Sequence, residues 1–442
     1  MVSLSEALMD LPDKATVPFS REAARYSWLV VAMLWFVCFL NYADRQGIFS
    51  LFSLLKKEFA LSDVQLGIVA ACFMWAYSIF GPVAGWISDR VSRSRMVIGA
   101  LCFWSVMTGA TAWAHSYHSL LWLRMLGGLG EAFYFPAAMS LIASYHGSTT
   151  RSRAMALHQS SVYAGTIGGG AMSAYVAERT GWRSSFEIFG ALGILLALVL
   201  LFFLRDPVVP VDALDPAASD GEKVSGNLVS NLREMATNKG VLVMIAVFMG
   251  ANFVAVIFLT WMPTFLQRKF NMHLGVAAFN STAYIQAASV IGVIAGGFFA
   301  DFFCRRWKGG RQLVQVIGLL GGVPFLFFTG HSLTVRVLIS SMLGFGLFKG
   351  LYDANIWASL YDFVKPEQRG FATGLMNSLG WLGAGFAPIA VAAAASRYSL
   401  SSCISMTAAI YFLLVLPLYF LFLKRSNALP AAPPVAIDHL NS

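Results

Sequence analysis

The stretch that decides the fold reads Gly85-Trp-Ile-Ser-Asp89-Arg90-Val-Ser-Arg93-Ser-Arg95, and an echo of it reads Gly297-Phe-Phe-Ala-Asp301-Phe-Phe-Cys-Arg305-Arg306. In each copy a Gly, an Asp and an Arg stand at positions i, i+4 and i+8, so they share one face of a helix end and the following loop. We expect the glycine to let a neighbouring helix approach, and the charged residues to tie helix ends together where the lipid stops. The repeat predicts two copies of one membrane bundle.

The composition excludes a soluble globular protein. Of the 442 residues 57% are hydrophobic and only 12% are charged, and the mean hydropathy is +0.67. Soluble domains carry about 25% charged residues, so we predict an integral membrane protein. The net charge of +9 does not indicate nucleic-acid binding, because the basic residues lie in short loops between apolar runs and not in a stripe.

The apolar segments divide the chain into two similar halves. Segments of about 20 residues or more, long enough to cross a bilayer, fall near 28–55, 64–87, 96–114, 120–145, 154–176 and 185–204, and again near 241–265, 276–300, 312–329, 335–362, 371–395 and 403–423. We therefore predict an all-α membrane protein with twelve transmembrane helices in two pseudo-symmetric six-helix bundles. The expected parts are a tail (1–27), a bundle (28–204), a linker rich in Pro, Asp, Ser and Gly (205–240), a second bundle (241–423) and a tail (424–442).

The loops on the side of the two tails hold most of the loop Lys and Arg residues. By the positive-inside rule both termini are expected to be cytoplasmic, in a bacterial inner membrane. The first 20 residues lack an apolar core, so no cleavable signal peptide is expected. We expect the protein to act as a monomer among membrane lipids.

No motif in the spans indicates a metal, a cofactor or catalysis. The five cysteines form no CxxC, the spans contain neither HExxH nor GxSxG, and His146 and His158 are not spaced as metal ligands. We therefore expect no metal, no cofactor and no enzymatic activity. The tails are too short for the added domain of a transporter-derived sensor.

The first span carries charges at membrane depth. Asp44 and Arg45 fall near its middle, where a charge costs at least about 2.5 kcal/mol, so both must face a polar cavity or partners on other helices. Adjacent residues point about 100° apart on a helix, which disfavours a bond between the two side chains. Each therefore needs a partner from another span.

The fourth span offers such partners. Arg124 and Glu131 are seven residues apart, on one face and roughly 10 Å apart along the axis. With Asp44 and Arg45 they would form one buried polar cluster, either lining a transport pathway or holding helices together. A carboxylate that loses its proton when the cavity changes sides is what a proton-coupled carrier needs. Close packing and a bend are expected at Gly127, Gly128, Gly130 and Pro136.

The second half has a weaker counterpart. Lys349 and Asp353 are an i, i+4 pair that can neutralise itself, which favours a structural role. Other polar or aromatic side chains in the spans are candidate substrate contacts or interhelical glue: Tyr42, Tyr77, His158, Gln159, Tyr163, Tyr284, Gln286, Asn355, Asn377 and Trp381.

Taken together, these patterns resemble the major facilitator superfamily over nearly the whole chain. The Gly85 to Arg95 segment resembles its signature between the second and third helices, and Arg124 with the following glycines resembles its fourth-helix motif. Within it, several stretches are similar to the anion:cation symporter family, which carries sugar acids and other organic anions: Asn41-Tyr42-Ala-Asp44-Arg45, Tyr77, Gly130-Glu131-Ala132, Phe135-Pro136-Ala137 and Trp261-Met-Pro263.

That resemblance implies proton-coupled uptake of a small organic anion. Arg45 would bind the anionic group of the substrate, Asp44 and Glu131 would carry protons, and Arg124 would tune Glu131. The repeated Gly-Asp-Arg motif would have structural and gating roles. The fifth span has Gly165 but lacks the Gly-Pro motif of drug antiporters, which favours symport.

A second resemblance keeps an alternative open. The Asn-Tyr-x-Asp-Arg and Gly-Glu-Ala-x-Tyr patterns also resemble Spinster-type lipid carriers, and Gly81-Pro82-Val83 is closer to that group. The rival hypothesis is therefore a proton-coupled carrier of an amphipathic lipid.

Overall fold

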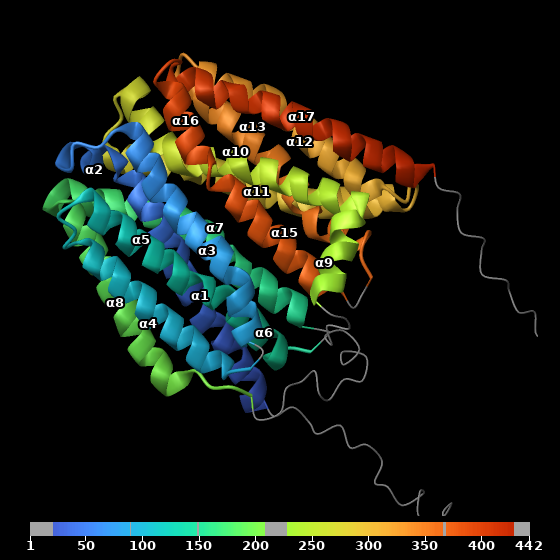
Figure 1. Ribbon diagram of the computed structural model, residues 1–442, viewed down its shortest axis with the longest axis horizontal. Coiled ribbons are helices and arrows are strands. Elements are labelled where there is room, and N and C mark those ends of the chain that lie inside the picture. The colour runs from blue at the N-terminus through green and yellow to red at the C-terminus, as the bar shows by residue number, and fades with distance from the viewer. Residues whose placement is uncertain (1–20, 89, 148–149, 208–227, 366–367, 428–442) are drawn as a thin grey trace, which may run out of the picture.

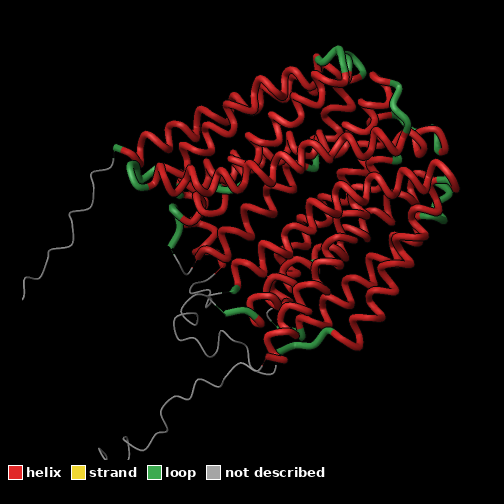
Figure 2. Tube along the Cα trace, turned by 180° about the vertical axis from the view of Figure 1, so that it is seen from behind, coloured by secondary structure: helices red, strands yellow, loops and turns green. Residues whose placement is uncertain are grey.

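The computed structural model describes residues 21–88, 90–147, 150–207, 228–365 and 368–427, and these ranges contain helices and loops without a strand. Figures 1 and 2 show two helical bundles lying side by side. The helices of the first are α1 (Arg21–Ser50), α2 (Phe52–Glu58), α3 (Asp63–Ser88), α4 (Arg93–Thr111), α5 (Tyr117–Ala132), α6 (Tyr134–Tyr145), α7 (Arg151–Thr180) and α8 (Trp182–Phe203). Those of the second are α10 (Lys239–Phe270), α11 (Leu274–Cys304), α12 (Gly310–His331), α13 (Val335–Asp353), α14 (Ile356–Tyr361), α15 (Arg369–Ala384), α16 (Ala387–Ala395) and α17 (Leu400–Ser426).

The expected twelve spans are all present as helices. Besides the first span, in which the short α2 follows α1, three spans consist of two helices in sequence, α5 with α6, α13 with α14 and α15 with α16. Within the described ranges, 10 spans are long and apolar enough to cross a membrane by length and composition. The other two predicted spans, α4 and α7, are more polar but pack inside the first bundle against α8 and α1. The protein is thus an all-α membrane protein with the predicted twelve-helix architecture.

Some boundaries differ from those expected. The first predicted span, 28–55, is divided at Leu51 into α1 and the short α2, and α1 begins at Arg21. The predicted linker contains a helix, α9 (Leu228–Thr237), that the composition did not indicate. Residues 1–20, 208–227 and 428–442, which include most of the predicted tails and linker, lie outside the described residues.

Prolines explain two of the three interrupted spans. A proline removes the hydrogen bond to the carbonyl four residues earlier, and its ring clashes with that carbonyl. Pro136 lies four residues after Ala132, the last residue of α5, and Pro388 lies four residues after Ala384, the last residue of α15. The bend expected from Pro136 is therefore confirmed, one turn before the proline itself.

The two bundles repeat one packing scheme. In the first, α3 packs on α5, and α4 packs on α5 and α8. In the second, the equivalent helices do the same: α11 packs on α13, and α12 packs on α13 and α17. This shared scheme confirms the pseudo-symmetry that the repeated motif predicted.

The bundles meet mainly at one end of the molecule, which we call the α2 end; the opposite end, next to α9, is the linker end. Two large apolar clusters each belong to one bundle, but a third combines both. It includes Phe52 of α2 and Trp261 of α10, whose ring centroids are 5.7 Å apart. Trp261 Nε1 also donates to Pro388 O (3.1 Å).

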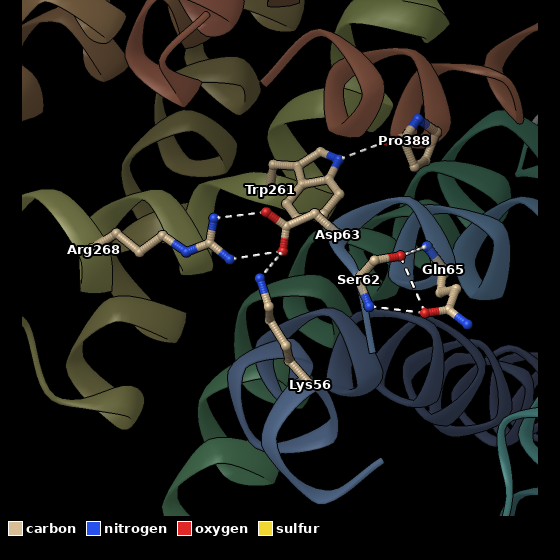
Figure 3. A network of polar contacts seen from close by, with 7 residues as sticks. All are labelled: Lys56, Ser62, Asp63, Gln65, Trp261, Arg268 and Pro388. Carbon is tan, nitrogen blue, oxygen red and sulfur yellow. Dashed lines mark hydrogen bonds and ion pairs between the residues drawn. The ribbon is translucent and has the colours of Figure 1, made fainter. Parts of the chain in front are cut away.

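Polar contacts join the bundles at the same end. Figure 3 shows Asp63 of α3 accepting hydrogen bonds from Lys56 of α2 and from Arg268 of α10. About halfway along α3, Ser78 Oγ donates to Ser378 O (2.5 Å). Between this contact and the linker end, no hydrogen bond or ion pair between described residues joins the two bundles. The α2 end is therefore closed.

Candidate functional site

The predicted charged cluster is present where α1, α3 and α5 meet. Arg45 Nη2 donates a hydrogen bond of 2.8 Å to Glu131 Oε2, and the two side chains are 7% and 0% exposed. Asp44 Oδ2 lies 3.9 Å from Arg124 Nη1 and accepts a 2.7 Å hydrogen bond from Thr108 Oγ1 of α4. As the helix geometry predicted, Asp44 and Arg45 pair with other helices and not with each other.

The pairing differs from the one that the resemblance implied. Arg124 was expected to tune Glu131, but its ion-pair partner is Asp44, whereas Arg45 holds Glu131. The arginine expected to bind substrate is therefore occupied by a carboxylate of its own bundle in this structure. Any substrate anion that binds Arg45 must compete with Glu131.

Aromatic rings surround the Arg45 guanidinium. Its Cζ lies 4.9 Å from the ring centroid of Tyr42, 5.0 Å from those of Phe73 and Tyr77, and 5.3 Å from that of Trp381. Each ring face attracts a cation within about 6 Å. Trp381 belongs to α15 of the second bundle, so the cluster faces the interface between bundles and not the lipid.

Glycines bring the helices close enough to build this cluster. A Cβ added at Gly128 would lie 2.4 Å from Phe73 O, so only glycine lets α5 approach α3 there. The ring centroid of Phe73 then lies 5.0 Å from Arg45 Cζ and 4.5 Å from Arg124 Cζ, so one ring contacts two guanidinium groups. Close packing is also confirmed at Gly130, but Gly127 faces open space.

The cluster is closed and incompletely hydrogen-bonded. Several buried atoms have no hydrogen-bond partner among the described residues: Asn41 Nδ2, Asp44 Oδ1, Arg45 Nε, Arg124 Nε and Nη2, and Glu131 Oε1. Buried polar groups in native proteins are nearly always paired, with protein, water or a ligand. Open donors next to open acceptors suit a site whose hydrogen bonds are completed by water or by a bound anion.

The second charged pair is also present. Lys349 Nζ donates to Asp353 Oδ2 one helical turn away, and the side chains are 18% and 30% exposed. The predicted self-neutralising pair is thus confirmed. Unlike the first cluster, it is partly exposed.

Other candidate substrate contacts are distributed over the molecule. Tyr77 and Trp381 form an edge-to-face pair with centroids 6.1 Å apart, directly over Arg45. Tyr163 of α7 lies near Lys349. Tyr284 packs against the apolar core of the second bundle, away from the cluster.

The remaining polar candidates have structural roles or no polar contact. Asn355 Nδ2 donates to the backbone of α11 and of its own span, so its expected role in binding substrate is not supported. His158 is buried and bonded to Tyr134. Gln159, Gln286 and Asn377 make no hydrogen bond within the described part of the chain.

In the first copy of the repeated motif, one of two arginines connects neighbouring helices. Arg93 at the start of α4 donates to Ser140 O (3.3 Å) and to Ser144 Oγ of α6. Arg90 instead donates to Trp86 O (2.8 Å) and stacks on the ring of the same tryptophan. The expected tie is therefore confirmed for Arg93 and wrong for Arg90.

The glycines and the second copy of the motif do not act as expected. A Cβ at Gly85 or at Gly297 would meet nothing within 4 Å, so no neighbouring helix approaches either glycine in this conformation. Asp301 and Arg305 are exposed and form no hydrogen bond or ion pair within the described ranges. Asp89 lies outside the described residues.

Two members of the cluster were not predicted. Thr108 binds Asp44, and Phe73 lies between the two arginines. A threonine on an apolar helix and one of 36 phenylalanines carry no local signal. Only the contacts of these two side chains in the folded structure reveal them.

Two bundles of membrane-spanning helices around a buried charged cluster define an integral membrane transporter, and not an enzyme. The chain belongs to the Major Facilitator Superfamily, whose family model matches residues 34–388. This confirms the first resemblance drawn from the motifs.

Individual relatives are distant but span most of the chain. A probable galactarate/D-glucarate transporter of Escherichia coli is 27% identical over 417 residues, covering 88% of this chain and 90% of that protein. Protein spinster of Drosophila melanogaster is 26% identical over 385 residues, covering 82% of this chain and 61% of that protein. The crystal structure of a bacterial homologue of the lysosomal transporter Spinster, inward-facing and unoccupied, matches with a TM-score of 0.77 at 20% identity and covers 92% of this chain and 99% of that one.

Proposed function

We propose that this protein couples inward proton flow to the uptake of a small organic anion, a sugar acid, by alternating access of one site between the two bundles. The observation that carries the proposal is the buried Arg45–Glu131 pair at the bundle interface. Its support among the relatives is the galactarate/D-glucarate transporter, which matches along nearly its full length.

The pair couples a proton to an anion by competition. Arg45 is a planar donor suited to a carboxylate, and Glu131 occupies it in the empty site. A substrate carboxylate that takes this place leaves Glu131 buried without its partner, which is strongly unfavourable for an ionised group. Protonation of Glu131 removes that cost, so anion binding draws a proton into the site.

The orientation follows from the loop charges. With both termini cytoplasmic, in a bacterial inner membrane, the closed α2 end faces outward. The structure then corresponds to an inward-facing state of a monomeric carrier. Release of substrate and proton would take place at the linker end.

Uptake into proteoliposomes tests the proposal. Purified protein should accumulate radiolabelled galactarate when the vesicle lumen is more alkaline than the medium, and should stop when the gradient is collapsed. Arg45→Ala should abolish binding, because it removes the cation. Asp44→Asn and Glu131→Gln should retain substrate exchange but lose accumulation driven by protons.

The lipid alternative gives a different result. If no sugar acid enters the vesicles under any pH gradient, while a labelled lysolipid moves between the leaflets in a protein-dependent way, the proposal is refuted in favour of a Spinster-like carrier. Exchange that is unaffected by Arg45→Ala would also refute it.

A further inference from the structure

The Lys349–Asp353 pair is placed as a functional pair would be. Both residues lie inside the span Val335–Tyr361, yet their side chains are 18% and 30% exposed. Ionisable residues at membrane depth face a bundle interior or a water-filled cavity. The partial exposure shows that the surface beside the pair is accessible.

That surface faces the first bundle and not the lipid. Tyr163 of α7 lies near both Lys349 and Asp353. The helix α13 packs tightly on α11, where a Cβ added at Gly346 would lie 2.4 Å from Ile285 O. Since α11 in turn packs on α7 and Tyr163 of α7 lies near the pair, the pair lies on the side of the second bundle that is next to α7.

The segment of α7 next to this pair also packs on α1, the helix that carries Arg45. Two residues after Tyr163, a Cβ added at Gly165 would lie 3.0 Å from Tyr42 Cβ. The ring of Tyr42 in turn lies 4.9 Å from Arg45 Cζ. One turn of α7 therefore lies beside both the Lys349–Asp353 pair and Tyr42, whose ring contacts Arg45.

We infer that Lys349 is a second anion-binding group of the transport site, and that the preferred substrate is a dicarboxylate held by Arg45 at one end and by Lys349 at the other. This inference rests on the proposed function. In this structure each cation is held by a carboxylate of its own bundle, Glu131 for Arg45 and Asp353 for Lys349. A dicarboxylate replaces both.

The properties of the second pair suit this role. An ammonium group on a flexible stem can turn from Asp353 to a ligand while keeping its three donors. Asp353 is exposed enough to stay hydrated when Lys349 leaves it. A substrate bound at both ends would also draw the two bundles together, which is the motion that alternating access requires.

Two sugar acids that differ at one end test the inference. Galactarate and galactonate share a six-carbon polyhydroxy chain, but galactarate has a second carboxylate where galactonate has a CH₂OH group. The natural chain, purified at full length, should bind galactarate roughly tenfold or more tightly than galactonate, which is the value of one charge-assisted hydrogen bond.

Two variants separate binding from structure. The double variant Lys349→Met/Asp353→Asn leaves no unpaired charge, and its affinity for galactarate should fall about tenfold, to the level of galactonate. Asp353→Asn alone frees Lys349 and should keep or increase the preference for galactarate. The control Lys365→Met/Glu234→Gln removes an exposed ion pair of the same bundle, and should keep the preference of the natural chain.

A structural pair predicts the opposite pattern. The inference is overturned if both Lys349/Asp353 variants weaken the binding of the two sugar acids equally, or if the natural chain binds galactarate and galactonate with equal affinity. In either case, binding of both sugar acids would still support the proposed function. Binding of neither sugar acid would overturn the proposed function and this inference with it.

Discussion

The contact between Asp63 and Arg268 closes the α2 end, and its removal should open that end. Arg268 donates two hydrogen bonds to the Asp63 carboxylate, Nη1 to Oδ2 at 3.0 Å and Nη2 to Oδ1 at 2.9 Å. The two residues belong to different bundles, so this contact exists only while the α2 end is closed (Figure 3). We expect Arg268→Gln to shift the protein toward the conformation that is open at this end.

The size of the shift follows from exposure. The Arg268 and Asp63 side chains are 42% and 23% exposed, so water screens the pair and it contributes about 1 kcal/mol. Since about 1.4 kcal/mol corresponds to a tenfold change in an equilibrium constant, the ratio of open to closed molecules should rise roughly fivefold. Lys56 donates to the same carboxylate at 2.6 Å from within the first bundle. Lys56→Gln is therefore a matched control that should leave the ratio nearly unchanged.

Spin labels across the bundle interface measure this ratio. Lys57 of the first bundle and Leu333 of the second are exposed near the α2 end, and labels there report the separation by double electron–electron resonance. The exposed Cys102 and Cys304 are replaced by Ser in this background. If Arg268→Gln and Lys56→Gln give the same distance distribution, the contact does not hold the bundles together and the reasoning is wrong.

Two further predictions concern packing and pH. An added Cβ at Gly169 would lie 2.1 Å from Ala43 Cα, so Gly169→Ala should lower the free energy of unfolding by at least about 1–3 kcal/mol. The control Gly374→Ala adds a Cβ in open space and should leave the stability unchanged. Equal melting temperatures of the two variants would contradict this prediction. The hydrogen bond from Gln368 lowers the pKa of Glu234. The contact therefore stabilises α9 at pH values above the ordinary glutamate pKa of about 4.3, and this stabilisation is lost as the pH falls through the pKa of Glu234 in the folded protein. Amides of α9, corrected for intrinsic rates, should exchange faster at acid pH than at pH near 7, and Glu234→Gln should remove that difference; identical protection in the natural chain at both pH values would disprove it.

The sequence was sufficient for the spans and for the membership of the charged cluster. Charges in the middle of an apolar run must find partners, and the seven-residue spacing of Arg124 and Glu131 put two such partners on one helical face. It could not say which arginine pairs with which carboxylate. That choice depends on how α1 and α5 are rotated and how closely they approach α3, which contacts such as Gly128 on Phe73 determine.

The predicted contacts of the repeated motif depend on the conformation of the protein. Helical spacing correctly placed Gly85 and Gly297 near helix ends, but what lies opposite a helix face differs between the states of a carrier. In the state described here both glycines face open space. For Asn355 the sequence left two roles open, because a buried amide is satisfied equally well by a ligand and by backbone carbonyls, and sequence does not show that Gly296 O lies within reach.

The charges of the cluster explain why coupling would be strict. With both carboxylates ionised, Asp44, Arg45, Arg124 and Glu131 sum to zero, and the cluster is buried. A bound carboxylate alone would make the closed site negative, and a proton alone would make it positive; either net charge is costly where water is excluded. Only the cluster without substrate or added protons, and the cluster with one added proton for each bound carboxylate, remain neutral while the bundles move. Trp381 of the second bundle contacts Arg45 directly. The net charge of the cluster therefore acts at the interface between the two bundles, which must rearrange during transport.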